Sequence, residues 1–319
     1  MQYTRVTNSY TSDSVIRNLL SNRSKLVDTQ TQISSGKRIS KISDDVLAGV
    51  SVVSTNSSLG KINNYIKNID NAQSELNVTD ATLTTLIDSV QQARELTVQA
   101  SSSTAGPEEL QAINAQIKQI IEQVKDLGNT KYGTTYIFGD LQTNTAPFTV
   151  PATGETQYTG SVNGVGGRKA EASDGVAIPI NVSGDKIFGE YYTGDHDNDP
   201  ATPDTLDGQG LLKTLITLSN ELGSANPDQS VIRSKLDGFD SSLQTITNTQ
   251  AQLGGTSNRL DTIKTALQDD QINLTKIKSG AEDIDMAKTI SDLQFQQTAL
   301  DASLQVSAKI IQPSLLTYM

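Results

Sequence analysis

Both ends of the chain carry apolar residues that recur about every seven positions, and this spacing constrains the fold more than any other feature. Side chains three and four residues apart share one face of an α-helix, so each row indicates a long helix with a narrow apolar stripe. A narrow stripe is buried by another helix rather than by a globular core. We expect the contacts to be made by Leu19, Leu26, Ile33, Ile290, Leu293, Leu300, Leu304 and Ile311, the last five forming one 3-4 seam near the end of the chain. The pattern predicts terminal helices that pair with each other or with neighbouring copies, as in an assembly protein.

The charges of the two ends are consistent with pairing. Residues 1–43 carry a net charge of +5, and residues 281–319 carry a net charge of −3. Opposite signs favour pairing of the start of the chain with its end. Each exposed pair of opposite charges stabilises such a pairing by about 0.3–0.5 kcal/mol. Ordinary solvated helix faces would have a similar composition, so the charges support the pairing without requiring it.

The composition argues against most kinds of chemistry. The chain has 319 residues, a net charge of −11, one His, and no Cys or Trp. Without Cys there are neither disulfides nor thiolate metal sites. It has no basic run to bind nucleic acid, and no stretch of about 20 apolar residues to span a membrane. We therefore expect no catalytic residues, no cofactor and no metal.

Several local signals divide the chain into helices. Gly36 follows a helix over residues 12–34, and Ser43 then caps the next helix with Asp44 and Asp45 in its first turn. Later boundaries are expected at Gly106-Pro107, Asn226-Pro227-Asp228 and Ser279-Gly280. The helix after residue 228 carries a seven-residue apolar row: Phe239, Ile246, Leu253, Leu260, Leu267 and Leu274. These signals predict a largely helical chain.

The middle of the chain has a different character. Residues 134–138 and 176–180 are rich in β-branched and aromatic residues, which is typical of strands. Residues 140–207 have a net charge of −8. The predicted fold is mainly α with an inserted β domain, an elongated nested helical hairpin with N- and C-terminal coiled-coil helices. We expect three domains: 1–43 with 281–319, 44–139 with 208–280, and the acidic β insert 140–207.

Three short motifs could suggest a chemical site, but each has a simpler explanation. Asp195, Asp197 and Asp199 alternate as in a calcium loop, although Pro200 and Leu206 replace its glycine and glutamate; the lone His196 lies among them. The glycine-rich basic stretch 164–169 lacks the spacing of a phosphate loop. Three acidic residues near the end are best explained as residues of a helix start: Glu282, Asp283 and Asp285.

Specific motifs at both ends resemble the flagellin superfamily. They are Ile33-Ser34-Ser35-Gly36-Lys37-Arg38-Ile39 with Ser43-Asp44-Asp45, and the stretches 282–287 and 296–300. Residues 136–140 and 143–148 are similar to the start of the outer domain in the branch of that superfamily that forms the hook-filament junction. Residues 184–188 resemble a later strand of the same branch.

This resemblance implies a structural protein of the extracellular bacterial flagellum rather than an enzyme. Such proteins are exported unfolded by the flagellar type III apparatus without a cleaved signal, and residues 1–10 have no apolar signal segment. Their terminal segments are mobile in the monomer and form a coiled coil in the assembled tube. The implied partners are further copies, other hook-associated proteins, flagellin, and an export chaperone at the C-terminal region. The alternatives are a filament flagellin and, more remotely, a signalling coiled coil or a secreted enzyme acting through the β domain.

Overall fold

The computed structural model describes residues 8–102, 106–149, 157–158, 167–189 and 210–311. This part of the chain contains seven helices and six short strands, which confirms the predicted mainly α fold with an inserted β region. Two compact units are present, residues 1–62 with 268–319 and residues 63–267. The predicted division into three domains stays a prediction. None of the helices that could be assessed has the length and hydrophobicity needed to cross a membrane.

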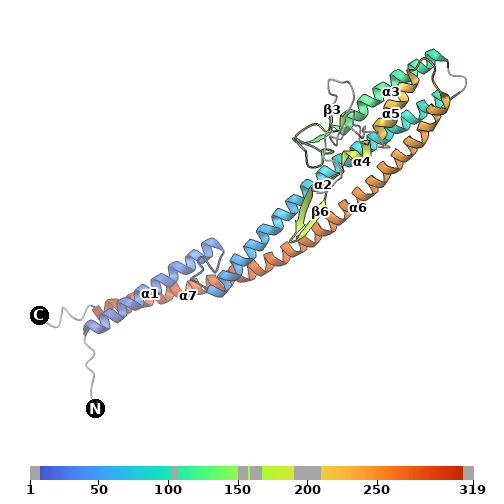
Figure 1. Ribbon diagram of the computed structural model, residues 1–319. Helices are drawn as coiled ribbons and strands as arrows, with labels where there is room; N and C mark the ends of the chain where they lie inside the picture. Colours follow the sequence, from blue (N-terminus) through green and yellow to red (C-terminus); the bar gives the residue numbers. More distant parts are fainter. Residues whose placement is uncertain (1–7, 103–105, 150–156, 159–166, 190–209, 312–319) are drawn as a thin grey trace, which may run out of the picture. The chain divides into compact units, whose positions relative to one another are not determined.

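The terminal unit contains two helices from opposite ends of the chain. Helix α1 (Asn8–Ser35) and helix α7 (Met286–Ile311) lie side by side (Figure 1). Helix α1 ends as predicted, because Gly36 adopts a left-handed φ of 71° and donates its N–H to the Gln32 carbonyl at 2.8 Å. The unit also includes the start of α2 (Val46–Ala100) and the end of α6 (Gln229–Glu282).

The start of α2 differs from the prediction. Asp45, not Ser43, caps this helix, because its Oδ1 accepts the Ala48 N–H at 3.1 Å. Asp44 instead closes the preceding turn, where its Oδ2 accepts the N–H groups of Ser40 and Lys41. A carboxylate can accept hydrogen bonds from free N–H groups both in a turn and at the start of a helix, so the sequence alone does not show which aspartate caps α2.

The end of α6 also lies further along the chain than predicted. The helix continues through Ser279 and Gly280, and the Asp283 N–H still donates to the Ser279 carbonyl at 2.9 Å. A single exposed glycine costs a helix only about 1 kcal/mol, which is too little to end one of this length. Glu282 therefore closes α6, whereas Asp285 starts α7 as expected, with its Oδ1 accepting the Lys288 N–H.

The larger unit buries apolar residues from most of its helices. Helix α3 (Pro107–Gly128) packs on α5 (Leu211–Leu222), and α3 begins at the predicted Pro107. The predicted α6 row is buried over the length that this unit contains: Phe239, Ile246, Leu253, Leu260 and Leu267. The polar residues beside the row reach α2, where Lys264 pairs with Asp70 at 2.6 Å.

The six strands form three two-stranded antiparallel sheets. Strand β1 (Lys131–Tyr132) pairs with β2 (Thr135–Tyr136), β3 (Phe148–Thr149) with β4 (Gln157–Tyr158), and β5 (Lys169–Ser173) with β6 (Val176–Pro179). The β5–β6 hairpin is held on α2 by an ion pair between Arg168 and Glu75 and by a hydrogen bond from Asn68 to the Glu171 carbonyl. Arg168 is thus a partly buried structural residue rather than part of a free basic turn.

The insert also contains a helix where a strand was expected. Residues 184–188 form helix α4 (Gly184–Phe188), which ends at Gly189 with a φ of 86°. Its Phe188 ring packs edge-on against Phe138 and Phe148, with centroids 5.1 and 5.0 Å apart. Burial of Phe188 among these rings favours the helix over a strand. Burial of the neighbouring Tyr158 raises the pKa of its hydroxyl. The acidic segment with His196 lies outside the described residues.

Candidate assembly site

The face of α1 that is covered in the terminal unit follows a 3-4 spacing. It is formed by Val15, Leu19, Asn22, Leu26, Thr29 and Ile33. The covered face of α7 has the same spacing and is formed by Thr289, Leu293, Gln296, Leu300, Ser303 and Ser307. We call these twelve residues the seam. Gly36 pairs with Ile284 and Asn22 pairs with Ser303, so the two helices run antiparallel.

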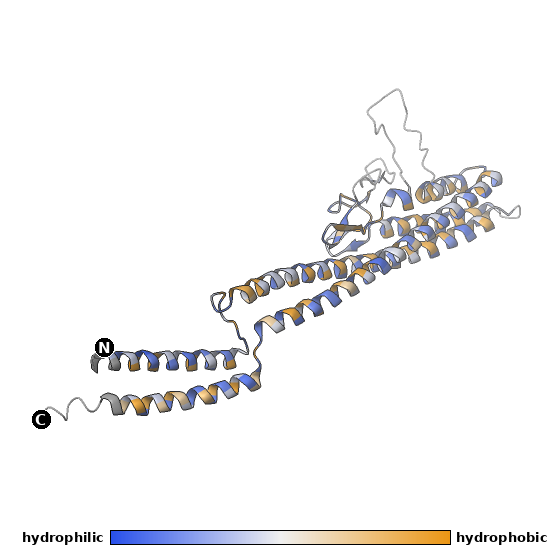
Figure 2. Ribbon diagram, turned by 90° about the horizontal axis from the view of Figure 1, so that it is seen from below, coloured by the Kyte–Doolittle hydropathy of each residue, from blue (hydrophilic) through white to orange (hydrophobic). Residues whose placement is uncertain are grey.

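Polar residues occupy half of the seam. Asn22 Nδ2 donates a hydrogen bond to Ser303 Oγ at 3.0 Å. Thr29 and Ser307 are more deeply buried than the seam leucines, with 6% and 8% exposure. Apolar and polar segments accordingly alternate along both terminal helices in Figure 2. The seam is therefore less apolar than the core of the larger unit.

Five of the eight residues predicted for assembly lie in the seam: Leu19, Leu26, Ile33, Leu293 and Leu300. Ile290 and Leu304 do not lie there, because Thr289 and Ser303, one position earlier, face α1 instead. Ile290 and Leu304 are 43% and 48% exposed. The side chain of Ile311 lies outside the described residues. An assembly role for these eight residues stays a prediction.

Both edges of the helix pair carry exposed apolar side chains. On α1 these are Ile16, Leu20 and Val27, each one position after a residue of the seam. On α7, Phe295, which is 75% exposed, and Val306 each lie one position before a residue of the seam, whereas Ile290 and Leu304 each lie one position after one. In an antiparallel pair, Phe295 and Val306 lie on one edge, and Ile290 and Leu304 lie on the other edge together with the exposed residues of α1. The edge with Phe295 and Val306 borders a groove of about 250 Å³ lined by Val15, Asn18, Ala302, Ser303, Val306 and Ser307.

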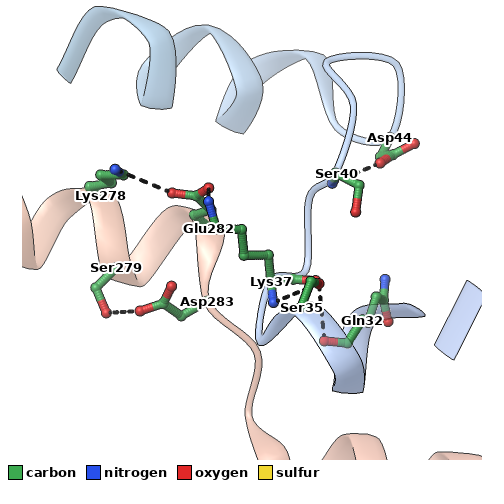
Figure 3. Close-up of polar contacts among 9 residues, drawn as sticks. All are labelled: Gln32, Ser35, Lys37, Ser40, Asp44, Lys278, Ser279, Glu282 and Asp283. Atoms are coloured by element: carbon green, nitrogen blue, oxygen red, sulfur yellow. Dashed lines mark hydrogen bonds and ion pairs between the residues drawn. The ribbon is translucent and has the colours of Figure 1, made fainter. Parts of the chain in front are cut away.

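A joint connects this pair to the other helices of the terminal unit (Figure 3). We define the joint as residues 36–45 and 281–285. Lys37 and Asp283 form an isolated antiparallel β-bridge. The Arg38 N–H donates to the Glu282 carbonyl at 2.6 Å, and the Ile284 N–H donates to the Gly36 carbonyl at 3.1 Å. These backbone bonds align the end of α1 with the start of α7.

Charged side chains reinforce the joint. Glu282 is only 7% exposed and accepts from Lys37 Nζ at 2.5 Å, while Lys278 lies 3.8 Å away (Figure 3). This hydrogen bond raises the pKa of Lys37. Arg38 pairs with Asp45 at 3.1 Å. The pKa of Asp45 is lowered, first by the Ala48 N–H and then by Arg38.

A second exposed apolar patch lies at the start of α2. It consists of Ile42, Val46, Leu47, Val50 and Val53. Leu47 is 86% exposed, and the three valines follow the i, i+4, i+7 spacing of one helix face. The spacing of these valines can be read from the sequence but their exposure cannot, because periodicity does not show what covers a face. Apolar patches of this kind commonly mark sites of protein association.

The site offers structural contacts rather than reactive groups. The acidic residues of the joint have structural partners, because Glu282 faces two lysines, Asp283 accepts from the Ser279 hydroxyl and Asp285 caps α7. Over the residues that can be described, no group of three or more His, Asp or Glu side chains is placed to bind a metal.

Comparison with known families matches both ends of this chain. The model of the bacterial flagellin N-terminal helical region matches residues 6–143, and that of the bacterial flagellin C-terminal helical region matches residues 236–319. Together they cover more than two thirds of the sequence. The chain belongs to the flagellin superfamily, and within it the chain is FlgL-like.

Individual relatives are consistent with this placement. Flagellar hook-associated protein 3 of Escherichia coli (strain K12) is 26% identical over 90% of this chain and 91% of its own length. The flagellar filament 30.7 kDa core protein of Treponema maltophilum is 23% identical over 87% and 86%. The crystal structure of Bacillus cereus FlgL covers 70% of this chain and 97% of its own, with a TM-score of 0.53 and 28% identity. That of the flagellar junction protein FlgL from Legionella pneumophila covers 73% and 100%, with a TM-score of 0.56; at 16% identity it shows a shared fold.

Proposed function

We propose that this protein is a structural subunit of the bacterial flagellum that joins hook-side subunits to filament-side subunits. The observation that carries this proposal is the α1–α7 pair, which leaves apolar residues exposed on both of its edges in a flagellin-superfamily chain. The similarity to a hook-associated protein 3 over nine tenths of the chain favours the junction.

The exposed edges suggest how copies assemble. The two edges are different surfaces, because one carries Ile16, Leu20 and Val27 of α1 with Ile290 and Leu304 of α7 and the other carries Phe295 and Val306 of α7, so contact between them would be heterologous. Heterologous contacts generate rings or helical tubes rather than closed dimers. Burial of a side chain such as Leu20 or Phe295 contributes about 1.5–3 kcal/mol, so a few such contacts would order an edge. Ile290 and Leu304 are exposed and would contribute to the same assembly contacts.

The apolar patch at the start of α2 would add a second contact. A Cβ at Gly49 would lie only 3.1 Å from the Ile42 Cα, so the joint packs closely on α2 at this glycine. This packing holds Ile42 beside the α2 valines. A neighbouring subunit would bury the patch in the assembled structure.

The remaining features of the proposal follow from the family. The protein would act outside the cell, after export in an unfolded state without a cleaved signal. Its partners would be further copies, other hook-associated proteins, flagellin, and an export chaperone that binds the C-terminal region. The expected three-domain division, 1–43 with 281–319, 44–139 with 208–280, and 140–207, belongs to this proposal. The protein would have no catalytic activity and would need no cofactor.

A filament flagellin is the second candidate. It is favoured by similarity to the Treponema filament core protein, although that relative is less similar than the hook-associated protein. Both candidates have the same fold, and they differ in the number of copies in a flagellum and in their position along it.

Localisation of the protein tests the proposal. An epitope-tagged chain would replace the native copy in its own bacterium, and isolated flagella would be labelled with antibody for electron microscopy. We expect label at the boundary between hook and filament. Label along the whole filament would support a filament flagellin, and absence of label from intact flagella would contradict both candidates.

A further inference from the structure

The polar residues of the seam are placed where a simple coiled coil would have leucines. Thr29 and Ser307 are buried, whereas Leu19, Leu26 and Leu300 are only partly covered. A polar core residue in a helix pair weakens the pair but restricts the arrangements in which it can form. The position of these groups therefore bears on both the specificity and the strength of the pairing.

The hydrogen bonds of these groups show which of them link the helices. Four hydroxyl groups donate to the carbonyl four positions earlier in the chain: Thr29 to Lys25, Thr289 to Asp285, Ser303 to Ala299 and Ser307 to Ser303. Asn22 differs, because its amide donates across the seam to Ser303 Oγ. Gln296 Oε1 is buried without a hydrogen-bond partner. The seam thus contains one specific polar link and one unsatisfied acceptor.

A shift of the helices would break the polar link. Movement of α7 by three residues would bring Leu300 to the place of Ser303 and leave the Asn22 amide against an apolar side chain. Asn22 is partly buried, and a polar group that loses its partner as it is removed from water is unfavourable, so this shift is disfavoured relative to the observed register. Pairing of α1 with an unrelated apolar helix is disfavoured for the same reason.

We propose that Asn22 and Ser303 determine the register and the partner of the α1–α7 pair, and that the polar seam keeps this pair weak in the single chain. Thr29 and Gln296 add to the weakness, since they occupy core positions without bonding across the seam. The inference builds on the proposed assembly function, but it concerns the isolated chain and is tested there.

The test replaces both linked residues in the full-length chain. In Asn22→Leu/Ser303→Leu the seam gains two apolar side chains and loses its only cross-helix link among the residues that the structure describes. We expect amide hydrogen exchange in α1 and α7 to slow by about tenfold, because a leucine-rich seam pairs more tightly. We also expect sedimentation to detect self-association at concentrations where the unaltered chain is monomeric, because register and partner are no longer selected.

The control adds two leucines outside the seam. Ser21 and Ser291 are exposed, so Ser21→Leu/Ser291→Leu matches the added hydrophobicity without altering the link. Amide hydrogen exchange in α3 is the internal reference, because it shows whether the larger unit stays folded in each variant. Slower exchange with self-association in the seam variant alone supports the proposal. Faster or unchanged exchange in α1 and α7, an unchanged monomer, or equal self-association in the control overturns it. Neither result depends on where the protein lies in a flagellum.

Discussion

The two units of this protein bury their apolar rows to very different extents. In the larger unit, Ile117 of α3, Leu215 of α5 and Phe239 of α6 are fully buried by other parts of the same unit. In the terminal unit, the leucines of the seam are only partly covered, and Leu20 and Phe295 face outward. The larger unit satisfies its apolar surface within one chain. The terminal unit leaves part of its apolar surface exposed, as the proposed assembly of copies requires.

Two phenylalanines give the sharpest test of this difference. Phe239→Ala removes a fully buried ring, and we expect it to lower the free energy of unfolding of the larger unit by about 3–5 kcal/mol. Phe295→Ala removes a largely exposed ring, and we expect a change within about 0.5 kcal/mol for the isolated chain. Urea denaturation of the two variants measures both effects. Equal losses would contradict the contrast between the units.

The assembly role of the seam can be tested by Leu300→Asp. We expect the larger unit to remain folded, because this residue lies in the other unit, and incorporation into flagella to be abolished, because a charge would be buried in the seam. Circular dichroism of the purified chain and immunoblots of isolated flagella give the two measurements. The matched control is Gln297→Asp, which places the same charge at an exposed position of α7. Normal incorporation of Leu300→Asp would exclude the seam from assembly.

Two glycines of the larger unit test how tightly it is packed. At Gly128 a Cβ would lie 2.5 Å from the Phe148 ring, so Gly128→Ala should lower the free energy of unfolding by about 1–3 kcal/mol. At Gly254 there is open space, so Gly254→Ala should raise it by about 0.5–1 kcal/mol through improved helix propensity. Thermal unfolding compares the two variants. Destabilisation by Gly254→Ala would indicate that this part of α6 requires a glycine.

The smallest expected effects concern two acidic caps with a lowered pKa, one in each unit among the residues that the structure describes. Asp45 caps α2, and its pKa is lowered mainly by the Ala48 N–H; Asp228 precedes α6, and its pKa is lowered mainly by the Ser230 hydroxyl. A lowered pKa in the folded state means that the contribution is present above the usual aspartate pKa of about 3.9. It is lost as the pH falls through the lowered value.

We therefore expect each cap to weaken only in acid. Amide exchange at the start of α2 and of α6, corrected for the intrinsic pH dependence, should become faster below about pH 4. Asp45→Asn should remove the pH dependence at α2 and leave that at α6 unchanged. Loss of protection at neutral pH in the unaltered chain would contradict this assignment of the caps.

Much of the fold could be predicted from local chemistry. Gly36 ends α1 because glycine accepts a left-handed conformation, and Pro107 starts α3 because a first-turn proline loses no helical hydrogen bond. The buried row of α6 from Phe239 to Leu267 followed from its seven-residue spacing. The less accurate predictions concern Glu282, which closes α6, and residues 184–188, which form a helix because aromatic rings from other segments bury Phe188.

The sequence by itself determined that both ends form long helices with 3-4 apolar spacing, and that the middle differs from them. These properties depend on side chains within a few turns of each other. Only the tertiary structure decided that Thr289 and Ser303, rather than Ile290 and Leu304, face α1, and that Glu282 pairs with Lys37. The reason is that periodicity defines a face of a helix but does not choose its partner or register. Here the joint and the Asn22–Ser303 hydrogen bond align segments about 250 to 280 residues apart in the chain.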